Sequence, residues 1–164
     1  MALAWSIRYF SRALGAGNKL SRLIVLPFRI LRPAAETDFL AFSLPDALTK
    51  SLSGLESLVV RSSLVASRFG GDGMDPRKIG AEAEVDVIVA GTLLHAGDLI
   101  RVSSQLTDAS AGTLLWSYTT QVPVGDLFQV QDELVQRIVD SLSLPLTARE
   151  RRMLRTDVPA SKRA

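Results

Sequence analysis

The chain has no cysteine and only one histidine among its 164 residues. Disulfide bonds, thiolate metal sites and cysteine nucleophiles are therefore excluded, and so is a metal site made of several histidines. Aromatic residues are also scarce, at 6%, whereas 47% of the residues are hydrophobic. This composition predicts a globular interior built mainly from valine, leucine, isoleucine and alanine. The length predicts one domain with tails, able to fold without covalent cross-links.

Long hydrophobic runs are also lacking. No stretch approaches the ~18–20 apolar residues that cross a bilayer, so the sequence predicts no membrane span. Arg8 interrupts the apolar run at the N-terminus, and no basic residue precedes that run, which argues against a secretory signal. We therefore expect a cytoplasmic location for the chain as it stands, and a periplasmic one if it belongs to a longer membrane-anchored chain.

The net charge of +2 hides an uneven distribution. Residues 1–35 carry six Lys or Arg and no acid, and residues 145–164 carry six against two acids. Residues 36–144 are left with seven Lys or Arg against fifteen Asp or Glu. Because such a centre repels phosphate, the sequence argues against a nucleic-acid partner.

The first residues have the pattern of a short helix. Apolar side chains recur at helical spacing over residues 2–14, and the basic side chains lie off that stripe. Residues 1–21 are thus predicted to be a basic, amphipathic segment. Two roles stay open for it: a helix that lies on a membrane surface or docks on a partner, and a linker helix that packs on its own domain.

The next segments predict a β-α-β unit with two parallel strands. The apolar run 22–28 is expected to be a strand covered on both faces, with Pro27 limiting it to an edge position or to its last residues. Ser43-Leu-Pro-Asp46 has the form of a capping box and predicts a helix through about Leu52. A second strand is expected over 58–61.

The middle of the chain predicts a flexible loop and then an antiparallel meander. Residues 69–73 are rich in glycine, and Asp75-Pro76 predicts the start of a short helix. Strands are expected over 85–90, 99–106 and 113–122, joined by turns at Gly97-Asp98 and between Asp108 and Gly112. Apolar and polar residues alternate along the second of these strands, so one face of the meander should be wetter than the other.

A long helix is predicted to close the domain. The apolar side chains of residues 126–144 form a stripe, with Phe128, Val135 and Val139 beside it. Thr147-Ala-Arg-Glu150 predicts a second capping box, which begins a short basic helix that runs to about Arg155. The fold class is therefore α/β with a mixed sheet. The predicted domain covers residues 22–144, and residues 145–164 form a helix and a linker, which suggests that the chain is cut from a longer one.

Short motifs spread through residues 22–155 carry a family resemblance. In this order and spacing they resemble the N-terminal TolB-like module of bacterial signalling proteins, which stands beside tetratricopeptide repeats, kinase, cyclase or winged-helix domains. The sequence departs from that pattern at Pro45, Ala83 and Val87. The matching motifs are Ile24-Val-Leu-Pro27-Phe28, the stretch from Phe39 to Leu48 (an aromatic followed by a helix start), Val60-Arg-Ser-Ser63, Ile79-Gly80, Val85-Asp86, Gly91-Thr92, Gly97-Asp98, Arg101-Val102, Gln105-Leu106, Asp108, Gly112, Leu115-Trp116 and Phe128 with Gln131-Asp-Glu133.

The resemblance implies a binding or coupling module rather than an enzyme. It supplies no catalytic, cofactor-binding or metal-binding residue, and its partners would be another protein or the adjoining domains. We expect the contact with such a partner to be made through the sheet edge, loop 68–75 or the basic ends. No small-molecule substrate is evident. It marks nine residues as structural: Pro27, Phe28, Gly91, Gly97, Asp98, Gln105, Asp108, Gly112 and Trp116. The alternative function is a peripheral envelope assembly protein that binds the membrane through the N-terminal helix.

Other residues invite chemical interpretations, each with a structural counterpart. His95 would have to serve alone as the base of a small hydrolase, and it is more simply an exposed residue at a strand end. The glycines at 70–73 lack the residues of a phosphate loop and predict only flexibility. Glu82, Glu84 and Asp86 suggest a metal or acid-base cluster, but a solvated acidic edge is favoured. Trp116 and Tyr118 could stack a sugar or a base, but packing is favoured.

Overall fold

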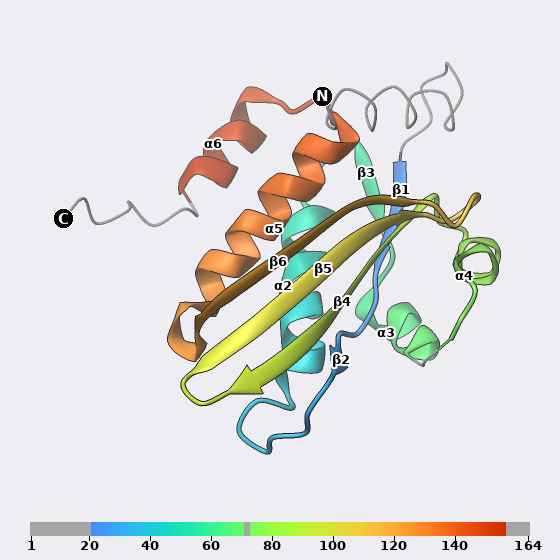
Figure 1. The fold of residues 1–164 in the computed structure, drawn as a ribbon. Helices are drawn as coiled ribbons and strands as arrows, with labels where there is room; N and C mark the ends of the chain where they lie inside the picture. The colour runs from blue at the N-terminus through green and yellow to red at the C-terminus, as the bar shows by residue number, and fades with distance from the viewer. Residues whose placement is uncertain (1–20, 71–72, 157–164) are drawn as a thin grey trace.

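The structure is a computed structural model that describes residues 21–70 and 73–156 (Figure 1). Its described part contains a mixed sheet in the order β3-β1-β4-β5-β6, with the short β2 paired to β4. The α/β fold class expected from the sequence is confirmed. The elements are β1 (Ser21–Val25), β2 (Arg29–Ile30), α2 (Leu40–Ser53), β3 (Leu58–Val60), α3 (Ser63–Ala66), η1 (Ser67–Phe69), α4 (Pro76–Ala83), β4 (Val87–Ala96), β5 (Leu99–Asp108), β6 (Leu114–Pro123), η2 (Val124–Asp126), α5 (Leu127–Leu142) and α6 (Ala148–Thr156).

The sheet has a parallel half and an antiparallel half. β1 lies between β3 and β4 and is parallel to both, as the β-α-β pattern predicts. Pro27 lies just past the end of β1, where its missing N–H costs the sheet no hydrogen bond. β4, β5 and β6 form the antiparallel meander. Gly97 and Gly112 take positive φ angles of 61° and 70° in the two connecting turns, a conformation that glycine adopts without strain.

One face of the sheet is covered by α2 and α5, which lie side by side behind the strands (Figure 1). The amide of Gln131 on α5 donates to the hydroxyl of Ser51 on α2, at 3.4 Å. Between these helices and the strands lies the larger core, in which Leu48, Leu134 and Ile138 are fully buried. Since α5 contributes its whole apolar stripe to this core, it is an integral part of the domain.

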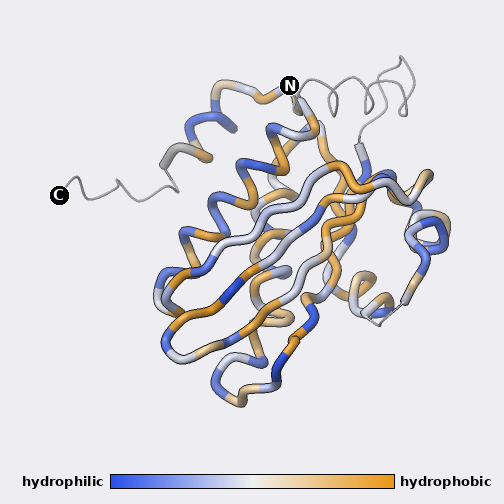
Figure 2. The backbone as a smooth tube through the Cα atoms, viewed as in Figure 1, coloured by the Kyte–Doolittle hydropathy of each residue, from blue (hydrophilic) through white to orange (hydrophobic). Residues whose placement is uncertain are grey.

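The opposite face is covered only in part. Ile79 and Ala83 of α4, together with Phe69 of η1, pack on Ile24 and Ile88 to form a smaller core. Among the described residues, no helix lies over the rest of this face, on β4, β5 and β6. Figure 2 shows hydrophilic and hydrophobic residues alternating over part of β5, and the odd-numbered residues of β5, from Leu99 to Thr107, are more exposed than the even-numbered ones. The wetter face predicted for the meander is confirmed.

The start of α2 differs from the sequence prediction. The helix begins at Leu40, three residues before the predicted cap, so Ser43 lies inside it and Pro45 is an interior residue. A proline has no N–H to donate to the carbonyl four residues earlier, here that of Ala41. The backbone N–H of Phe28 donates to this carbonyl instead, at 2.9 Å. The position of the proline is therefore compatible with a helix because another segment uses the freed acceptor.

Three further predictions need correction. The predicted flexible segment 69–73 includes one residue too many, because α3 and η1 occupy residues 63–69 and Phe69 is buried. Residues 71 and 72 of that segment lie outside the described residues. Phe128 does not join the buried stripe of α5, and 77% of it is exposed. The first strand of the meander, β4, begins at Val87 rather than at residue 85 and extends to Ala96.

The short helix α6 packs back on the domain. The hydroxyl of Thr147 accepts from the N–H of Glu150 at 3.1 Å, as the capping pattern predicts. The Glu150 carboxylate is buried and accepts from the backbone N–H of Glu56, at 3.3 Å. The C-terminal helix is thus attached to the turn between α2 and β3. The linker predicted after it, residues 157–164, lies outside the described residues.

Candidate interaction surface

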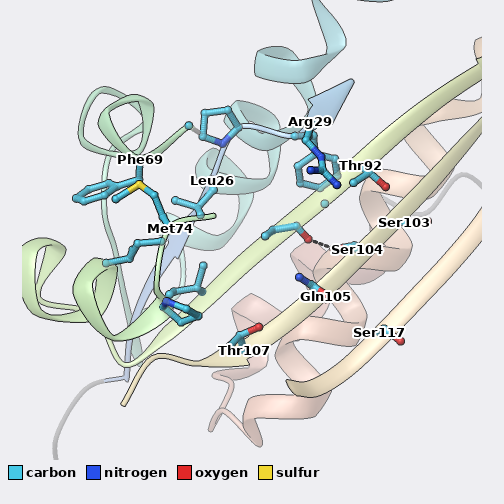
Figure 3. Close-up of a pocket in the computed structure, with 18 of the residues that line it drawn as sticks. Leu26, Arg29, Phe69, Met74, Thr92, Ser103, Ser104, Gln105, Thr107 and Ser117 are labelled. Atoms are coloured by element: carbon cyan, nitrogen blue, oxygen red, sulfur yellow. Dashed lines mark hydrogen bonds between the residues drawn. The ribbon is translucent and has the colours of Figure 1, made fainter. Parts of the chain in front are cut away.

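A groove lies on the uncovered face of the sheet, beside η1 and the start of α4 (Figure 3). Its volume is about 750 Å³. The floor is formed by β4, β5 and β6, and the wall by the segment after β1 and by the segment from η1 to α4. Several separate parts of the chain therefore build it.

The floor of the groove is rich in uncharged hydrogen-bonding side chains. Thr92, Ser103 and Thr119 lie opposite one another on three successive strands, and the hydroxyl of Thr119 donates to that of Ser103 at 3.0 Å. Gln105 and Ser117 form the next such row. Hydroxyl and amide groups can both donate and accept, so this floor can bind the polar groups of an uncharged ligand.

The wall is apolar. Phe69 and Met74 lie across the groove from the polar side chains of β5 in Figure 3. Pro27 and Leu26 continue this wall, and Arg29 lies at one end of it, near Thr92. The groove thus combines a polar floor with an apolar wall, as recognition sites in proteins commonly do.

A smaller apolar cavity of about 360 Å³ adjoins the groove, between the start of α2 and α3. Phe39 and Phe42 line it and are 61% and 64% exposed. Phe42 also lines the groove. Two large exposed aromatic side chains next to a groove extend the apolar surface that is available to a partner.

Asp46 ties α2 to α3 at the base of this cavity. Its carboxylate accepts from the hydroxyl of Ser63 at 2.7 Å and lies 2.8 Å from the ammonium of Lys50. The bonds from Lys50 and Ser63 lower the pKa of Asp46 below its usual value of 3.8. Both bonds favour the ionised carboxylate. The bond from Ser63 links α2 to α3, whereas Lys50 lies on α2 itself, so protonation of Asp46 weakens this link because it removes the negative charge.

This geometry predicts an acid-dependent loss of stability. Because the pKa of Asp46 is lower in the folded chain, its stabilisation is present above the unfolded pKa and is lost as the pH falls through the folded one. With 40% of the side chain exposed, we expect less than about 1 kcal/mol. In urea titrations from about pH 5 down to about pH 2, Asp46→Asn should show a shallower loss of stability than the wild type, and Ser63→Ala an intermediate one. A slope in Asp46→Asn equal to that of the wild type would contradict this assignment.

Two of the acidic residues near α4, Glu84 and Asp86, lie beside arginines. Asp86 is bound by Arg22, whose guanidinium Nη2 lies 3.0 Å from one carboxylate oxygen and whose Nε lies 3.2 Å from the other. This pair raises the pKa of Arg22, chiefly through the hydrogen bond. Arg61 donates to the carbonyl of Ala83 and lies 3.6 Å from Glu84. Asp86 and Glu84 are thus each paired with an arginine, whereas the sequence predicts an acidic edge that contacts only solvent.

His95 and the two aromatic residues of β6 lie apart from the groove. His95 is half-buried in β4 and not fully exposed as the sequence predicts, and it is not among the described residues that line the groove. Trp116 and Tyr118 pack against the larger core. The Tyr118 hydroxyl donates to Glu133, and the Arg137 guanidinium carbon lies 3.8 Å from the centre of its ring. The packing role predicted for both aromatics is confirmed.

The residues of the family resemblance occupy turns, the core and the groove. Pro27, Phe28, Gly91 and Gln105 line the groove. A methyl group on Gly91 would lie 2.7 Å from the Phe28 ring and 2.6 Å from the carbonyl oxygen of Ser103, so this glycine allows Phe28 to pack on β4. Asp108 accepts from Ser110 in the turn that contains Gly112, and the carbonyl of Asp98, next to Gly97, accepts from the N–H of Val124 at 3.4 Å.

Sequence reasoning missed the groove as a unit. It proposed contacts through the sheet edge, loop 68–75 and the basic ends, of which Phe69, Gly70, Gly73 and Met74 do line the groove. The available signal was the alternation in β5, which marks Ser103, Gln105 and Thr107 as one face. The predicted helix at 2–14 lies outside the described residues, so its membrane or docking role stays a prediction. In the part of the chain that the structure describes, no helix is long and apolar enough to cross a membrane.

No family model matches the chain. Among curated proteins, it is 30% identical over 128 residues to "Putative adenylate cyclase 3" of Rhizobium meliloti (strain 1021). The match covers 78% of this chain but only 22% of the Rhizobium protein. The chain thus corresponds to less than a quarter of that relative.

Solved structures share the fold. TolB from Acinetobacter baumannii superimposes with a TM-score of 0.57 and 15% identity, over 76% of this chain and 29% of TolB. Lipoprotein GNA1162 from Neisseria meningitidis superimposes with a TM-score of 0.51 and 18% identity, over 74% of this chain and 99% of the lipoprotein chain. A chain of the PelC dodecamer from Paraburkholderia phytofirmans superimposes with a TM-score of 0.50 and 15% identity, over 77% of this chain and 90% of the PelC chain.

These likenesses define a class by its architecture. The chain has a TolB-like α/β fold, a mixed sheet covered on one face by two helices and grooved on the other. The match to 22% of a longer Rhizobium protein shows that a related sequence occurs as a segment of a larger chain.

Proposed function

We propose that this chain is a non-catalytic interaction module of a longer bacterial signalling protein, and that its groove binds a protein partner or an adjoining domain. Residues 22–144 would be the module, residues 1–21 an N-terminal segment, and residues 145–164 the connection to a neighbouring domain. The match to 22% of a protein named as a cyclase supports the view that such a module accompanies other domains.

The groove carries this proposal. An extended polypeptide offers uncharged N–H and C=O groups at regular spacing and apolar side chains between them. The hydroxyl and amide side chains of Ser103, Gln105 and Thr107 can form hydrogen bonds with the backbone groups of such a polypeptide. Phe69 and Met74 can pack against its apolar side chains. The exposed Phe39 and Phe42 extend the contact beyond the groove. Aromatic residues and methionine are enriched where proteins meet.

The lining residues also support a non-catalytic role. General acid-base catalysis needs a side chain that can carry a proton to or from the substrate. Among the described residues, the groove is lined by no histidine, aspartate or glutamate. The Rhizobium relative is named as a cyclase, but the aligned segment is too small a part of it to carry that activity over to this chain.

Site-specific crosslinking tests the binding role. A photoreactive p-benzoylphenylalanine at Gln105 or Met74 should crosslink in native cells to one polypeptide, either another protein or another segment of the parent chain. The same residue at Gln136, on the exposed side of α5, is the matched control and should not. Equal crosslinking from the three positions, or none from the groove, would refute the assignment of the groove.

A direct assay tests the non-catalytic role. The purified chain incubated with ATP and Mg²⁺ should form no cyclic AMP above the level of a protein-free control. Formation of cyclic AMP in proportion to the protein concentration would overturn this part of the proposal, whereas the crosslinking result would stand independently.

A further inference from the structure

The sheet ends in two different edges. In the described part of the chain, the edge strand β3 is three residues long and the opposite edge strand β6 is ten residues long, paired on one side only, with β5. An edge strand presents a row of N–H and C=O groups to which another strand can bind. The long edge therefore offers room for a second strand, and the short edge does not.

β6 lacks the features by which natural edge strands avoid pairing. Lysines, prolines, bulges and inward-pointing charges usually block such an edge. Residues 114–123 contain no charged residue, and their one proline, Pro123, is the last residue of the strand. The irregular register lies at the other end, next to Leu106 and Thr107 of β5. Between these ends, residues 116–122 keep a regular antiparallel register with β5.

We propose that two copies of this chain pair through β6, antiparallel across a two-fold axis near Tyr118 and Thr119, so that their sheets become continuous. In such an arrangement each residue of β6 lies opposite a residue of β6 in the other copy. A charged strand would bring like charges together at the axis, and β6 brings none. Because β3 is too short to pair with β6 along its length, the contact closes as a dimer rather than growing into a filament.

Charges beside the strand suit a second copy. Glu133 and Arg137 are exposed residues of α5 and both contact Tyr118, the first through its hydroxyl and the second over its ring. They have opposite sign and lie one helical turn apart. A two-fold axis near Tyr118 would bring the Glu133 side of one copy toward the Arg137 side of the other, so the charges are complementary.

The half-buried side chains of β6 also favour this contact. Trp116, Tyr118 and Val122 point toward α5 and pack on the larger core, and each keeps part of its surface exposed. A strand added beside β6 would cover that remainder. On the other face, the added strand would extend the rows of Ser and Thr side chains that form the floor of the groove.

A charge placed on the edge tests the proposal. The wild-type chain should sediment, at micromolar concentration, with twice its monomer mass of 17.8 kDa. Ser117→Lys, on the exposed face of β6, should raise the dissociation constant by about tenfold or more, because the lysines of the two copies repel near the axis. Gln105→Lys is the matched control for association, because Gln105 lies directly opposite Ser117 on the interior strand β5. It should remain a dimer.

A charge-swap experiment completes the test. Mixing Ser117→Lys with Ser117→Glu should give a mixed dimer with a lower dissociation constant than either variant shows alone. A wild-type chain that is monomeric at all concentrations overturns the proposal, as do equal losses in Ser117→Lys and Gln105→Lys or a failure of the mixture to associate. None of these outcomes touches the crosslinking test of the groove, because that test reports contacts of Gln105 and Met74.

Discussion

Leu134→Ala is expected to lower the free energy of unfolding by about 3 kcal/mol. Leu134 lies in the middle of α5, is fully buried and belongs to the core between the two helices and the sheet. Truncation removes buried apolar surface and leaves a cavity that the neighbouring side chains fill only in part. Urea unfolding followed by circular dichroism measures the loss, with a lower midpoint and an unchanged slope as the expected form.

The matched control for this prediction is Phe128→Ala, on the same helix. The sequence pattern places both side chains on the apolar side of α5, but 77% of Phe128 is exposed. Although its truncation removes more atoms, we expect a change within about 0.5 kcal/mol. Equal losses in the two variants would mean that α5 packs on the sheet with a different face.

Gly91→Ala should cost about 2 kcal/mol, although alanine ordinarily suits a strand no worse than glycine. The added methyl group would lie 2.6 Å from the carbonyl oxygen of Ser103 and 2.7 Å from the ring of Phe28. The first neighbour is backbone in the paired strand β5 and cannot move without disturbing the sheet. Thermal unfolding of the variant should show a lower midpoint temperature.

Gly125→Ala is the control, because nothing lies within 4 Å of a methyl group there, and it should unfold as the wild type does. In a background of Phe28→Leu, the further cost of Gly91→Ala should be smaller, because one of the two close contacts is relieved. A Gly91→Ala variant as stable as the wild type would refute the close packing of Phe28 on β4.

Local patterns were sufficient for most of the fold. The apolar run 22–28 predicts a buried strand, and the alternation along β5 with a glycine turn before it predicts a meander with one wet face. Both depend on neighbours within a few residues. The helix at Pro76 is predicted equally well, because its Asp75 cap lies beside it in the sequence.

The failures come from contacts between distant segments and from elements too short to give a pattern. The capping pattern at Ser43 is local and gives the wrong start for α2. The carbonyl of Ala41, which Pro45 leaves without a helical donor, accepts from the N–H of Phe28 instead, and no local pattern shows this contact. α3 and η1 contain four and three residues, too few for a periodic pattern. The groove could not be predicted because its wall and floor come from segments that only the folded chain brings together.

Pro45 has a consequence for protein engineering. A helix former at this position would restore an N–H four residues after Ala41 and would ordinarily stabilise the isolated helix. That N–H and the N–H of Phe28 would then share one carbonyl oxygen, which weakens the bond from Phe28. Helix propensity and the attachment of the strand end to the helix are therefore opposed at this residue. A design programme that optimises helices one at a time would select the change that loosens Phe28, a residue in contact with both the core and the groove.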